Sequence, residues 1–570
     1  MNKHIVEPGR VGRKWFLLAL FGIAAAAVAC RVFYLQILNK DFLINEGNAR
    51  AVRSATIPAY RGMITDRKRE PMAISTPVAS IWAVPGKVLD SGADLGELAD
   101  LLDTSAQQIR KFLAERQGRN FVYMKRQLTP DVARQVQSLK IPGINTSKEY
   151  KRYYPLGEVA SHLLGFTNVD DEGQEGIELA FDDWLRGTPG KKRVLKDLYG
   201  SIVKDIENIK QPSHGQSLTL ALDQRLQYLA YRELQTAVIN HKARGGMLLL
   251  LGVSTGEVFA LAVQPSFNPN NRSDLKDNLY RNRVVTDVFE PGSTIKPFTI
   301  AAALISGLYQ PETMIDTDPG RLLIGRYSIS DINNYGILSV SDVIRRSSNV
   351  GTTKVALSLG PERLWQLHND IGFGSPTMSG YPGEVPGTLS DHSGWSELDL
   401  ATVSYGYGIS VTTMQLAQAY SVIASGGLLY PISFQKVSAI PASRRVMPET
   451  VAFEINRMMR AVVGPAGSGR RAAVEGYHVA GKTGTVHKAS ASGYADDRYV
   501  SLFAGFAPAT EPRLVLVVVI DDPRAGQYFG GQVAAPVFSA VMQGALRILN
   551  IPPDNLIGLK KQALLANNTR

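Results

Sequence analysis

The sequence predicts a multidomain α+β protein whose largest domain is one antiparallel β-sheet flanked by helices. Three observations support this. Residues 213–550 carry strand-like segments at both ends and helix-like segments between them. A polar region of mixed composition, residues 39–212, precedes them. An apolar stretch at residues 15–38 has the length of one membrane helix, about 20 residues. The chain of 570 residues has room for roughly two or three domains.

The N-terminal segment is predicted to be a transmembrane signal anchor. Basic residues precede the apolar stretch, so the positive-inside rule places residues 1–14 in the cytoplasm as a short tail and the chain after residues 15–38 outside. A signal-peptidase site at residues 27–29, just before Cys30, is the alternative. Apolar residues and Tyr34 continue beyond that site, which favours the uncleaved anchor. With either outcome the body of the protein is exported and tethered to the membrane.

Composition excludes several kinds of site. The formal net charge is +11, but the basic residues are spread along the chain, so the charge does not indicate a nucleic-acid partner. It indicates instead an exported protein near an anionic membrane or polymer. Cys30 is the only cysteine, which excludes an intramolecular disulfide and a cysteine metal site. The eight histidines are scattered without an H-x-x-x-H pair, so we expect no metal and no other cofactor.

Residues 39–212 are predicted to form an elongated α+β pedestal that carries no chemistry. Its landmarks are residues 61–67 (RGMITDR), 152–157 (RYYPLG) and 173–178 (GQEGIE), whose residue types indicate turns and ion pairs. None of them has the spacing of a nucleophile and its base. Residues 210–215 (KQPSHG) are predicted to be a hinge.

The elements of the second domain follow from hydrophobic patterns. Residues 514–520 form an unbroken, mostly β-branched run, which is typical of a buried central strand. Residues 551–570 form a polar tail that we expect to be mobile. The predicted elements are a strand at 218–222, a helix at 224–238, a hairpin of strands 247–253 and 257–263, and strands beginning at 482 and covering 499–506 and 514–520.

Three short motifs in this domain carry the candidate chemistry. The S-x-x-K pattern occurs four times, beginning at Ser201, Ser273, Ser293 and Ser433. The third copy is the one that most closely precedes the S-x-N at Ser347 and then the K-T-G at Lys482, and motif matches gain weight from such context. The ordered set supplies a nucleophile, an amine to activate it, a polar bridge and a cationic strand. The candidate catalytic residues are Ser293, Lys296, Ser347, Asn349 and Lys482.

Ser293 is predicted to lie at the start of a helix. Residues 290–292 (EPG) indicate a turn, and Pro297 is tolerated only in the first turn of the helix that follows. The positive end of the helix dipole favours an alkoxide and a developing oxyanion. Lys296 follows on the same face, and burial would lower its pKa so that a neutral amine could take the serine proton. By itself the pattern also fits a capping serine and a solvated lysine.

The other two motifs have equally definite surroundings. Ser347-Ser348-Asn349 lies between helical stretches at 341–346 and 353–359, a place where a polar tripeptide is also typical of a helix cap. Residues 482–485 (KTGT) are expected on an edge strand that offers N–H groups, hydroxyls and a cation to an extended ligand, and a glycine there lets the ligand backbone approach. The candidate substrate-binding residues of this strand are Thr483, Gly484 and Thr485.

With these motifs the chain resembles the class B penicillin-binding proteins, above all the septal peptidoglycan D,D-transpeptidases of the FtsI type. The ordered trio of motifs is the signature of that superfamily. The resemblance covers nearly the whole chain and includes the anchor. The matching pedestal and sheet segments are 61–67, 154–162, 176–178 and 503–508.

Two further features belong to the comparison with this family. Tyr405 and Tyr407, in a Tyr-Gly-Tyr-Gly segment, resemble the family's active-site loop and are therefore candidate substrate-binding residues. One segment departs from the pattern: Lys68-Arg69-Glu70 stands where a small residue such as glycine usually follows the first pedestal motif. The departure bears on a pedestal turn or a partner surface and leaves the catalytic set untouched.

The resemblance implies a β-lactamase-like penicillin-binding transpeptidase domain at 213–550 and a dimerisation or pedestal domain at 39–212. It implies a serine-type D-Ala-D-Ala transpeptidase or carboxypeptidase that crosslinks stem peptides at the division septum and is acylated by β-lactams. The resemblance implies that Ser293 is the nucleophile, Lys296 the first choice of base and Ser347 the proton relay. Asn349 would hold Lys296 and the donor amide, and Lys482 would supply a positive electrostatic field. Thr483 and Thr485 would bind the terminal carboxylate, and the N–H groups of Ser293 and Thr485 would form the oxyanion hole. The identity of the base is disputed in this superfamily and stays open here.

The resemblance also implies partners and a location. The partners are D-Ala-D-Ala stem peptides, β-lactam antibiotics, an FtsW-type glycosyltransferase and other divisome membrane proteins, with no nucleic acid and no cofactor. The location is the cell inner membrane, with the N-terminus cytoplasmic and the catalytic domain periplasmic. Neither the acceptor amine nor the oligomeric state follows from the residues, although a wall with diaminopimelate fits the resemblance.

Four rival functions remain at this point. A β-lactamase shares the three motifs but needs neither a pedestal nor a retained anchor. A bifunctional synthase needs a glycosyltransferase domain, for which residues 39–212 are too short. A membrane scaffold or β-lactam sensor would bind penicillin without crosslinking. An elongation-type transpeptidase is distinguished from a septal one by resemblance alone.

Overall fold

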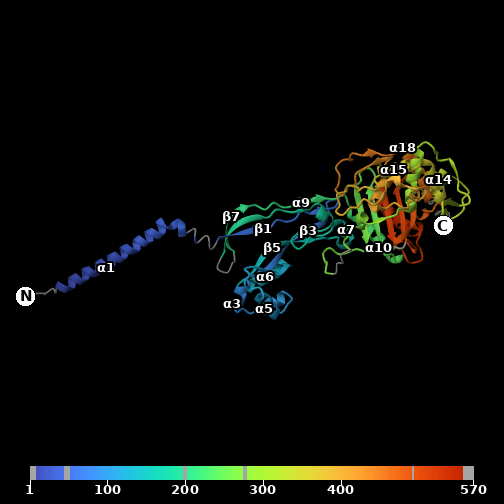
Figure 1. Cartoon of the computed structure of the whole chain (residues 1–570). Coiled ribbons are helices and arrows are strands. Elements are labelled where there is room, and N and C mark those ends of the chain that lie inside the picture. Colours follow the sequence, from blue (N-terminus) through green and yellow to red (C-terminus); the bar gives the residue numbers. More distant parts are fainter. Residues whose placement is uncertain are drawn as a thin grey trace, which may run out of the picture. The chain divides into compact units, whose positions relative to one another are not determined.

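The computed structural model describes residues 8–43, 46, 52–196, 202–273, 279–490 and 493–555, and the chain divides into two compact units (Figure 1). Unit 1 consists of Met1–Tyr60, Pro77–Tyr150 and Gly187–His214, and unit 2 of Arg61–Thr76, Lys151–Arg186 and Gly215–Arg570. Two pedestal segments thus share a compact unit with the catalytic motifs. The predicted domain boundary between residues 212 and 213 stays a prediction, and most of the predicted C-terminal tail, 556–570, lies outside the described residues.

Unit 1 begins with the predicted membrane segment. Helix α1 (Pro8–Phe33) continues as a π-helix, η1 (Tyr34–Leu38). Together they contain one candidate membrane span, Gly12–Leu38, whose mean hydropathy is 2.3 and of which 0% is buried. Its length and composition fit one crossing of a bilayer, and a signal sequence would meet the same criteria.

The rest of unit 1 contains a small sheet and a helical module. Strands β1 (Val52–Ile57), β6 (Gly190–Lys196) and β7 (Ile202–Lys210) pair antiparallel in the order β1-β6-β7. Beyond β7, the predicted hinge contains a bridge between Thr188 and Ser213, and the unit ends at His214. The module with its own apolar core comprises α3 (Pro85–Asp90), α4 (Gly96–Leu101), α5 (Ala106–Ala114), β4 (Val122–Leu128) and α6 (Pro130–Ser138). Strands β3 (Pro71–Ala83) and β5 (Ile144–Tyr153) run from the residues of one unit into those of the other.

Unit 2 is built on a five-stranded antiparallel sheet with the strand order β10-β9-β21-β20-β19. The predicted hairpin and the predicted partners of the K-T-G strand are confirmed, with β21 in the centre and β19 at the edge. Every residue of β21 is buried, as the unbroken apolar run predicted. The strands are β9 (Gly245–Gly252), β10 (Val258–Gln264), β19 (Ala480–Ser490), β20 (Gly493–Ala507) and β21 (Leu514–Asp521).

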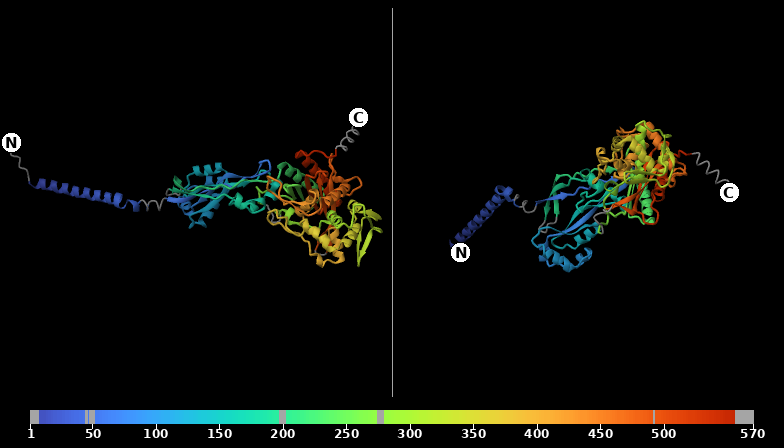
Figure 2. Two further views of the ribbon diagram at one scale, coloured as in Figure 1. Left: turned by 90° about the horizontal axis from the view of Figure 1, so that it is seen from above. Right: turned by 45° about the vertical axis from the view of Figure 1, so that its right-hand side comes forward.

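Helices cover both faces of this sheet, because alternate residues of a strand point to opposite sides. Val515 and Val517 belong to one apolar core, and Leu516 and Val518 belong to the other. In the left view of Figure 2 the red helix α19 and the yellow helices lie on opposite sides of the orange strands. The helices of the first core include α12 (Lys296–Ile305), α17 (Thr413–Ala424) and α18 (Glu449–Val463), and those of the second are α10 (Gln224–Asn240) and α19 (Gly530–Ile548).

The other elements of unit 2 are short or surround the motifs. They are β2 (Ile64–Thr65), η2 (Gly157–Ala160), α7 (Ser161–Leu164), α8 (Gly176–Ala180), α9 (Asp182–Leu185), β8 (Leu218–Thr219), α11 (Arg283–Thr286), β11 (Val288–Phe289), η3 (Gly292–Ile295), β12 (Met314–Asp316), β13 (Arg321–Ile324), β14 (Tyr327–Ser330), β15 (Ile337–Ser339), α13 (Val340–Arg346), α14 (Asn349–Leu359), α15 (Pro361–Asp370), η4 (His392–Gly394), α16 (Glu397–Ser404), β16 (Val411–Thr412), β17 (Leu428–Leu429), β18 (Arg444–Arg445) and η5 (Arg470–Ala472).

The pedestal landmarks meet in a buried ion network within unit 2. Glu178 accepts from Arg61 Nε and from Arg152 Nε, each at 2.6 Å, and all three side chains are at most 2% exposed. Arg61 also reaches Asp182 at 2.6 Å and the backbone oxygen of Asp171 at 3.1 Å. Burial raises the pKa of Asp171 to about 6. The three landmark motifs, which are separated in sequence, are therefore joined by one buried network of ion pairs.

Replacing Glu178 with alanine is expected to lower the free energy of unfolding by about 3–5 kcal/mol, because two buried guanidinium groups lose their shared carboxylate. Urea or thermal unfolding of the full chain measures the change. The control is Glu454→Ala, which removes an ion pair with Arg457 whose side chains are 31% (Glu454) and 53% (Arg457) exposed. This variant is expected to lower the free energy of unfolding by less than about 1 kcal/mol. Equal losses for the two variants would contradict the prediction.

Candidate active site

The S-x-x-K serine lies on a tight turn that leads into a buried helix. Ser293 is in the 3-10 turn η3, and Lys296 is the first residue of α12, so the predicted helix start is confirmed. Ser293 is half-buried and lines a cleft. The buried Tyr420 hydroxyl donates a hydrogen bond to the backbone oxygen of Thr294 in this turn, at 2.8 Å. The nucleophile candidate is thus fixed by the core rather than by a mobile loop.

The Tyr-Gly-Tyr-Gly segment packs directly against this turn. The N–H of Gly292 donates to the oxygen of Gly406 at 3.0 Å. A Cβ on Gly406 would lie 2.2 Å from the oxygen of Gly292, and the φ of Gly406 is +94°, so only glycine fits. Tyr407 lines the cleft and its ring centroid is 5.7 Å from that of Tyr405, which is not among the lining residues. Burial raises the pKa of Tyr405 to about 12.

Two buried lysines converge on one hydroxyl. Lys296 Nζ donates to the backbone oxygen of Ser347 at 2.6 Å, to its hydroxyl at 3.3 Å and to Asn349 Oδ1 at 2.7 Å. Lys482 Nζ donates to the same Ser347 hydroxyl at 2.9 Å. Both lysines are 0% exposed. The five predicted catalytic residues include four that form this one cluster, and the fifth, Ser293, lies one turn before Lys296.

Burial is the main cause of the unusual protonation of both amines. It lowers the pKa of Lys296 well below the usual value, and the nearby charge of Lys482 lowers it further, while Asp331 opposes both effects. Burial alone lowers the pKa of Lys482 to about 7. The three acceptors around Lys296 favour its ammonium form, but two ammonium groups cannot share one buried hydroxyl without strong repulsion. Burial and the repulsion between the two ammonium groups therefore both favour loss of a proton from this pair of lysines.

The S-x-N tripeptide joins two helices, as predicted. Ser347 ends α13 with a left-handed φ of +62°, which turns its hydroxyl and its backbone oxygen toward the lysines. Ser348 caps α14 by accepting from the N–H of Gly351. Asn349 is the first residue of α14, and its Nδ2 donates to the oxygen of Ser330 at 3.0 Å. The cap and the catalytic reading of this tripeptide are therefore compatible, since different residues serve each.

Asp331, which no motif singled out, anchors this tripeptide. Its carboxylate accepts from the Ser348 hydroxyl at 2.5 Å, from the N–H of Asn349 at 2.5 Å and from the N–H of Val350 at 3.1 Å. A carboxylate at a helix N-terminus is stabilised by the helix dipole. Asp331 therefore fixes where α14 begins, and with it the position of the Asn349 amide.

Replacing Asp331 with alanine is expected to slow β-lactam acylation by about 10- to 100-fold, because a displacement of about 1 Å in a positioning group can cost 10²-fold. The rate of adduct formation measures it. The control is Ser105→Ala, which removes a helix cap from α5 in unit 1 and is expected to lower stability by about 1 kcal/mol without slowing acylation. Similar acylation rates for the two variants would exclude a positioning role for Asp331.

The K-T-G strand presents two hydroxyls with defined partners. Thr483 Oγ1 lies 3.0 Å from Ser468 Oγ. Thr485 Oγ1 accepts from the N–H of Gly530 at 2.9 Å, so its own proton is free to be donated. A Cβ on Gly484 would lie 3.0 Å from side-chain atoms of Thr294 and Leu502. Glycine at this position therefore does more than let a ligand approach, because it also lets the turn that carries Ser293 pack against the strand.

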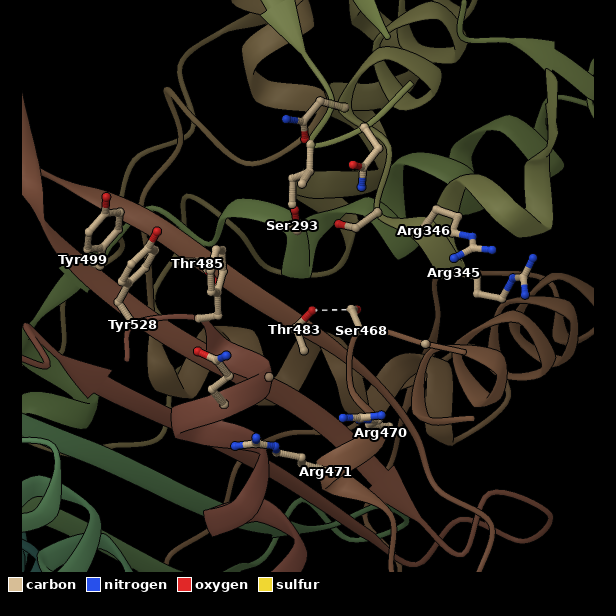
Figure 3. A pocket seen from close by; sticks show the side chains of 18 of the residues that line it. Ser293, Arg345, Arg346, Ser468, Arg470, Arg471, Thr483, Thr485, Tyr499 and Tyr528 are labelled. Atoms are coloured by element: carbon tan, nitrogen blue, oxygen red, sulfur yellow. Dashed lines mark hydrogen bonds between the residues drawn. The ribbon is translucent and has the colours of Figure 1, made fainter. Parts of the chain in front are cut away.

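These residues surround a cleft of about 710 Å³ (Figure 3). Of the predicted site residues, Ser293, Ser347, Asn349, Tyr407, Thr483 and Thr485 line it, Lys296 and Lys482 lie buried beneath it, and Gly484 and Tyr405 are not among the lining residues. The sequence analysis missed the other lining residues, which come from loops, helices and strands. They are Ile332, Asn333, Tyr335, Arg345, Arg346, Ala466, Gly467, Ser468, Arg470, Arg471, His487, Tyr499, Tyr528, Phe529, Gly531 and Gln532.

Other potential sites in the described part of the chain are weaker. The Ser433 hydroxyl, from another S-x-x-K copy, donates to the backbone oxygen of Gln435, and Lys436 donates to the backbone of Arg67. Ser201 lies outside the described residues. Within those residues no group of three or more His, Cys, Asp or Glu side chains could hold a metal ion.

Comparisons with known proteins agree with this geometry. Residues 246–543 match the family model of the penicillin binding protein transpeptidase domain, and residues 56–220 match that of the penicillin-binding protein dimerisation domain. The chain is 43% identical over 551 residues to the peptidoglycan D,D-transpeptidase FtsI of Escherichia coli (strain K12), covering 96% of this chain and 93% of that protein.

Further relatives and solved structures give the same result. A probable peptidoglycan D,D-transpeptidase, PbpC of Pseudomonas aeruginosa, is 43% identical over 540 residues, 95% of this chain and 96% of that protein. The probable transpeptidase PenA of Neisseria meningitidis is 40% identical, covering 97% of this chain and 95% of that protein. The apo structure of the TP domain of Burkholderia pseudomallei penicillin-binding protein 3 is 41% identical with a TM-score of 0.55 and covers 59% of this chain and 97% of that one.

Proposed function

This chain belongs to the penicillin-binding proteins, among the FtsI- and PenA-type peptidoglycan D,D-transpeptidases, and on that premise we propose that it crosslinks stem peptides of the cell wall at the division septum through an acyl-enzyme on Ser293. The observation that carries the proposal is that Lys296, one helical turn after Ser293, and Lys482 both donate to the Ser347 hydroxyl. Such a cluster supplies a base, a proton relay and a positive field at one point.

Acylation would begin with proton transfer from Ser293 to a neutral Lys296 amine as the serine oxygen attacks the carbonyl between the two terminal D-alanines. The N–H groups of Ser293 and Thr485 would stabilise the oxyanion. When the C–N bond breaks, the proton would pass by way of Ser347 to the departing amine, and D-alanine would leave. An ester between Ser293 and the penultimate D-alanine remains.

Deacylation would reverse these proton movements. An amine of a neighbouring stem peptide attacks the ester carbonyl, its proton returns to the Ser293 oxygen through the same groups, and a new amide crosslinks the two peptides. Attack by water instead would give D,D-carboxypeptidase activity. Thr483 and Thr485 are proposed to hold the terminal carboxylate of the donor, and Asn349 its amide. β-Lactams would acylate the same serine and remain there, because they resemble D-Ala-D-Ala.

The anchor supports a location and a partner. The candidate span Gly12–Leu38 follows a basic segment, which favours a cytoplasmic N-terminus and a periplasmic catalytic domain in the inner membrane. Its side chains are unburied in this chain, so they are available to another membrane helix, for which an FtsW-type glycosyltransferase of the divisome is our proposal. Co-purification in detergent should fail when the span is exchanged for an unrelated membrane helix.

The test of the function is intact-protein mass spectrometry of the full chain with benzylpenicillin, followed over an hour, together with a crosslinking assay on peptidoglycan precursors. We expect a stable adduct of drug mass and crosslinked product that penicillin suppresses. No adduct would overturn the acyl-enzyme proposal. Rapid loss of the adduct with hydrolysed drug would identify a β-lactamase, and an adduct without crosslinking would identify a scaffold or sensor.

The septal role needs a separate test in cells. Depletion of the protein should give filaments with unfinished septa if it acts in division. Rounded cells would instead identify an elongation-type transpeptidase. The two outcomes leave the acyl-enzyme chemistry untouched, so the role and the reaction are tested independently.

A further inference from the structure

The walls of the cleft around Ser293 differ in chemistry (Figure 3). On one side the rings of Tyr499 and Tyr528 stack with centroids 4.1 Å apart and an interplanar angle of 13°. Two pairs of arginines lie on other sides: Arg345 and Arg346 in the last turn of α13, opposite the tyrosines, and Arg470 and Arg471 in the 3-10 helix η5, beyond Thr483 and Ser468. The tyrosine side therefore suits flat or apolar groups, and the arginine sides suit anions.

Most of the positive charge of these four arginines is not neutralised. Arg345 pairs with Asp342 at 2.6 Å. Within the described ranges, the guanidinium groups of Arg346, Arg470 and Arg471 make no ion pair and no hydrogen bond, and all three residues are exposed. Three unpaired guanidinium groups along the wall of one cleft raise the local concentration of anions, and each can bind a carboxylate through two parallel hydrogen bonds.

The direction of the donor peptide decides which substrate meets these arginines. In the proposed mechanism the reacting carbonyl lies at the N–H groups of Ser293 and Thr485, and the terminal carboxylate of the donor at the hydroxyls of Thr483 and Thr485. The hydroxyl of Thr483 is 3.0 Å from that of Ser468, and Ser468 is two residues before Arg470. The donor therefore runs toward the arginines and ends before it reaches them. What lies beyond its last residue is the space that D-alanine leaves and the attacking amine enters.

We infer that Arg346, Arg470 and Arg471 form an acceptor subsite, which binds carboxylates of the stem peptide whose amine attacks the acyl-enzyme. The inference rests on the proposed function and deepens it by naming the acceptor as an anionic peptide. Stem peptides carry carboxylates other than the one beside the reacting amine, and those groups would reach past Thr483 to the arginines. The subsite then selects an acceptor by charge after the donor has reacted.

The test measures how the acyl-enzyme divides between two products. The full-length protein in detergent is acylated with an N-benzoyl-D-alanyl thioester and offered either L-Ala-γ-D-Glu-diaminopimelate or the same peptide with the α-carboxyl of D-Glu amidated. Both acceptors keep the carboxylate next to the attacking amine. The ratio of amide product to hydrolysed product is independent of how fast the acyl-enzyme forms. We expect the wild type to favour the carboxylate form about tenfold, as a few charge-assisted contacts allow.

Removing the charges should remove the preference. The triple variant Arg346→Gln, Arg470→Gln, Arg471→Gln is expected to use both acceptors equally, and R471K is expected to keep most of the preference. The matched control Arg363→Gln removes an exposed arginine on α15 that is not among the cleft-lining residues and should behave as the wild type. Raising NaCl should shrink the wild-type preference, since exposed charges are screened.

Two results would overturn the inference: equal use of both acceptors by the wild type, or the full acceptor preference in the triple variant. In the second case, a comparison of a carboxylated with an amidated donor identifies the ligand. A donor preference that the triple variant loses would assign the subsite to the donor. Absence of any acyl-enzyme would overturn the proposed function together with the inference, whereas the other results leave the function standing.

Discussion

Replacing Ser293 with alanine is expected to abolish the benzylpenicillin adduct and to reduce acylation by more than about 10⁵-fold. The other hydroxyl of the turn before α12, that of Thr294, is buried and donates to the oxygen of Pro291, so it cannot take the place of Ser293. The serine is held by a 3-10 turn whose backbone is hydrogen-bonded to the Tyr-Gly-Tyr-Gly segment and to Tyr420. The alanine variant should therefore fold normally and differ only in chemistry. Intact mass and the melting temperature, measured on one preparation, separate these two properties.

The chain offers a matched control for this variant. Ser433 also begins an S-x-x-K sequence, but its hydroxyl is bonded to the backbone of Gln435 and it does not line the cleft. Ser433→Ala is expected to be acylated at the wild-type rate. An adduct that survives Ser293→Ala and disappears in Ser433→Ala would show that Ser433, and not Ser293, is the nucleophile.

Replacing Lys296 with methionine is expected to slow acylation by about 10²–10⁴-fold, which is the usual contribution of a general base. Methionine keeps the length and the burial of the side chain but cannot accept a proton. Lys296→Arg should be as slow, because an arginine stays protonated. The rate constant for adduct formation at saturating drug measures the effect. Fast acylation of the arginine variant would exclude Lys296 as the base.

The dependence of acylation on pH should report both lysines. Loss of the proton from Lys296, whose pKa burial and Lys482 lower, produces the base, so the rate rises with pH through that titration. Loss of the proton from Lys482, whose pKa burial lowers to about 7, removes the field that attracts an anionic drug, so the rate then falls. The protons leave the pair in two macroscopic steps. Lys482→Arg should move the falling limb to much higher pH, and an unchanged limb would contradict this assignment.

Some parts of the fold could be predicted because their signals are local. The strand β21 is an unbroken β-branched run, and the turn before α12 is marked by a proline whose N–H a helix's first turn does not need. Helix α17 gave no such signal, since every one of its residues is buried. A helix that is buried on all sides has no solvent-exposed polar face from which helical periodicity is recognised.

The site divides in the same way. Ser293, Lys296, Ser347 and Lys482 were found because catalysis requires particular residue types at fixed positions within short motifs. Asp331 could not be found, because it acts across a loop on the backbone of another segment and its role exists only after folding. The arginines of the acceptor subsite come from two elements far apart in sequence, and no spacing rule joins them.

The strand order of the central sheet also governs when the protein can become active during its synthesis. Strand β9 hydrogen-bonds to β21, and the edge strand with Lys482 is joined to β9 only through β20 and β21. Ribosomes deliver the N-terminal end first, so helix α10 can pack on the β9–β10 hairpin early, but the edge of β9 that pairs with β21 stays unpaired until the last strands arrive. Such distant pairings form slowly. A chain released before Leu514 would carry the nucleophile and the K-T-G motif but no sheet to unite them, so quality control meets an aggregation-prone fragment and never a partly competent enzyme.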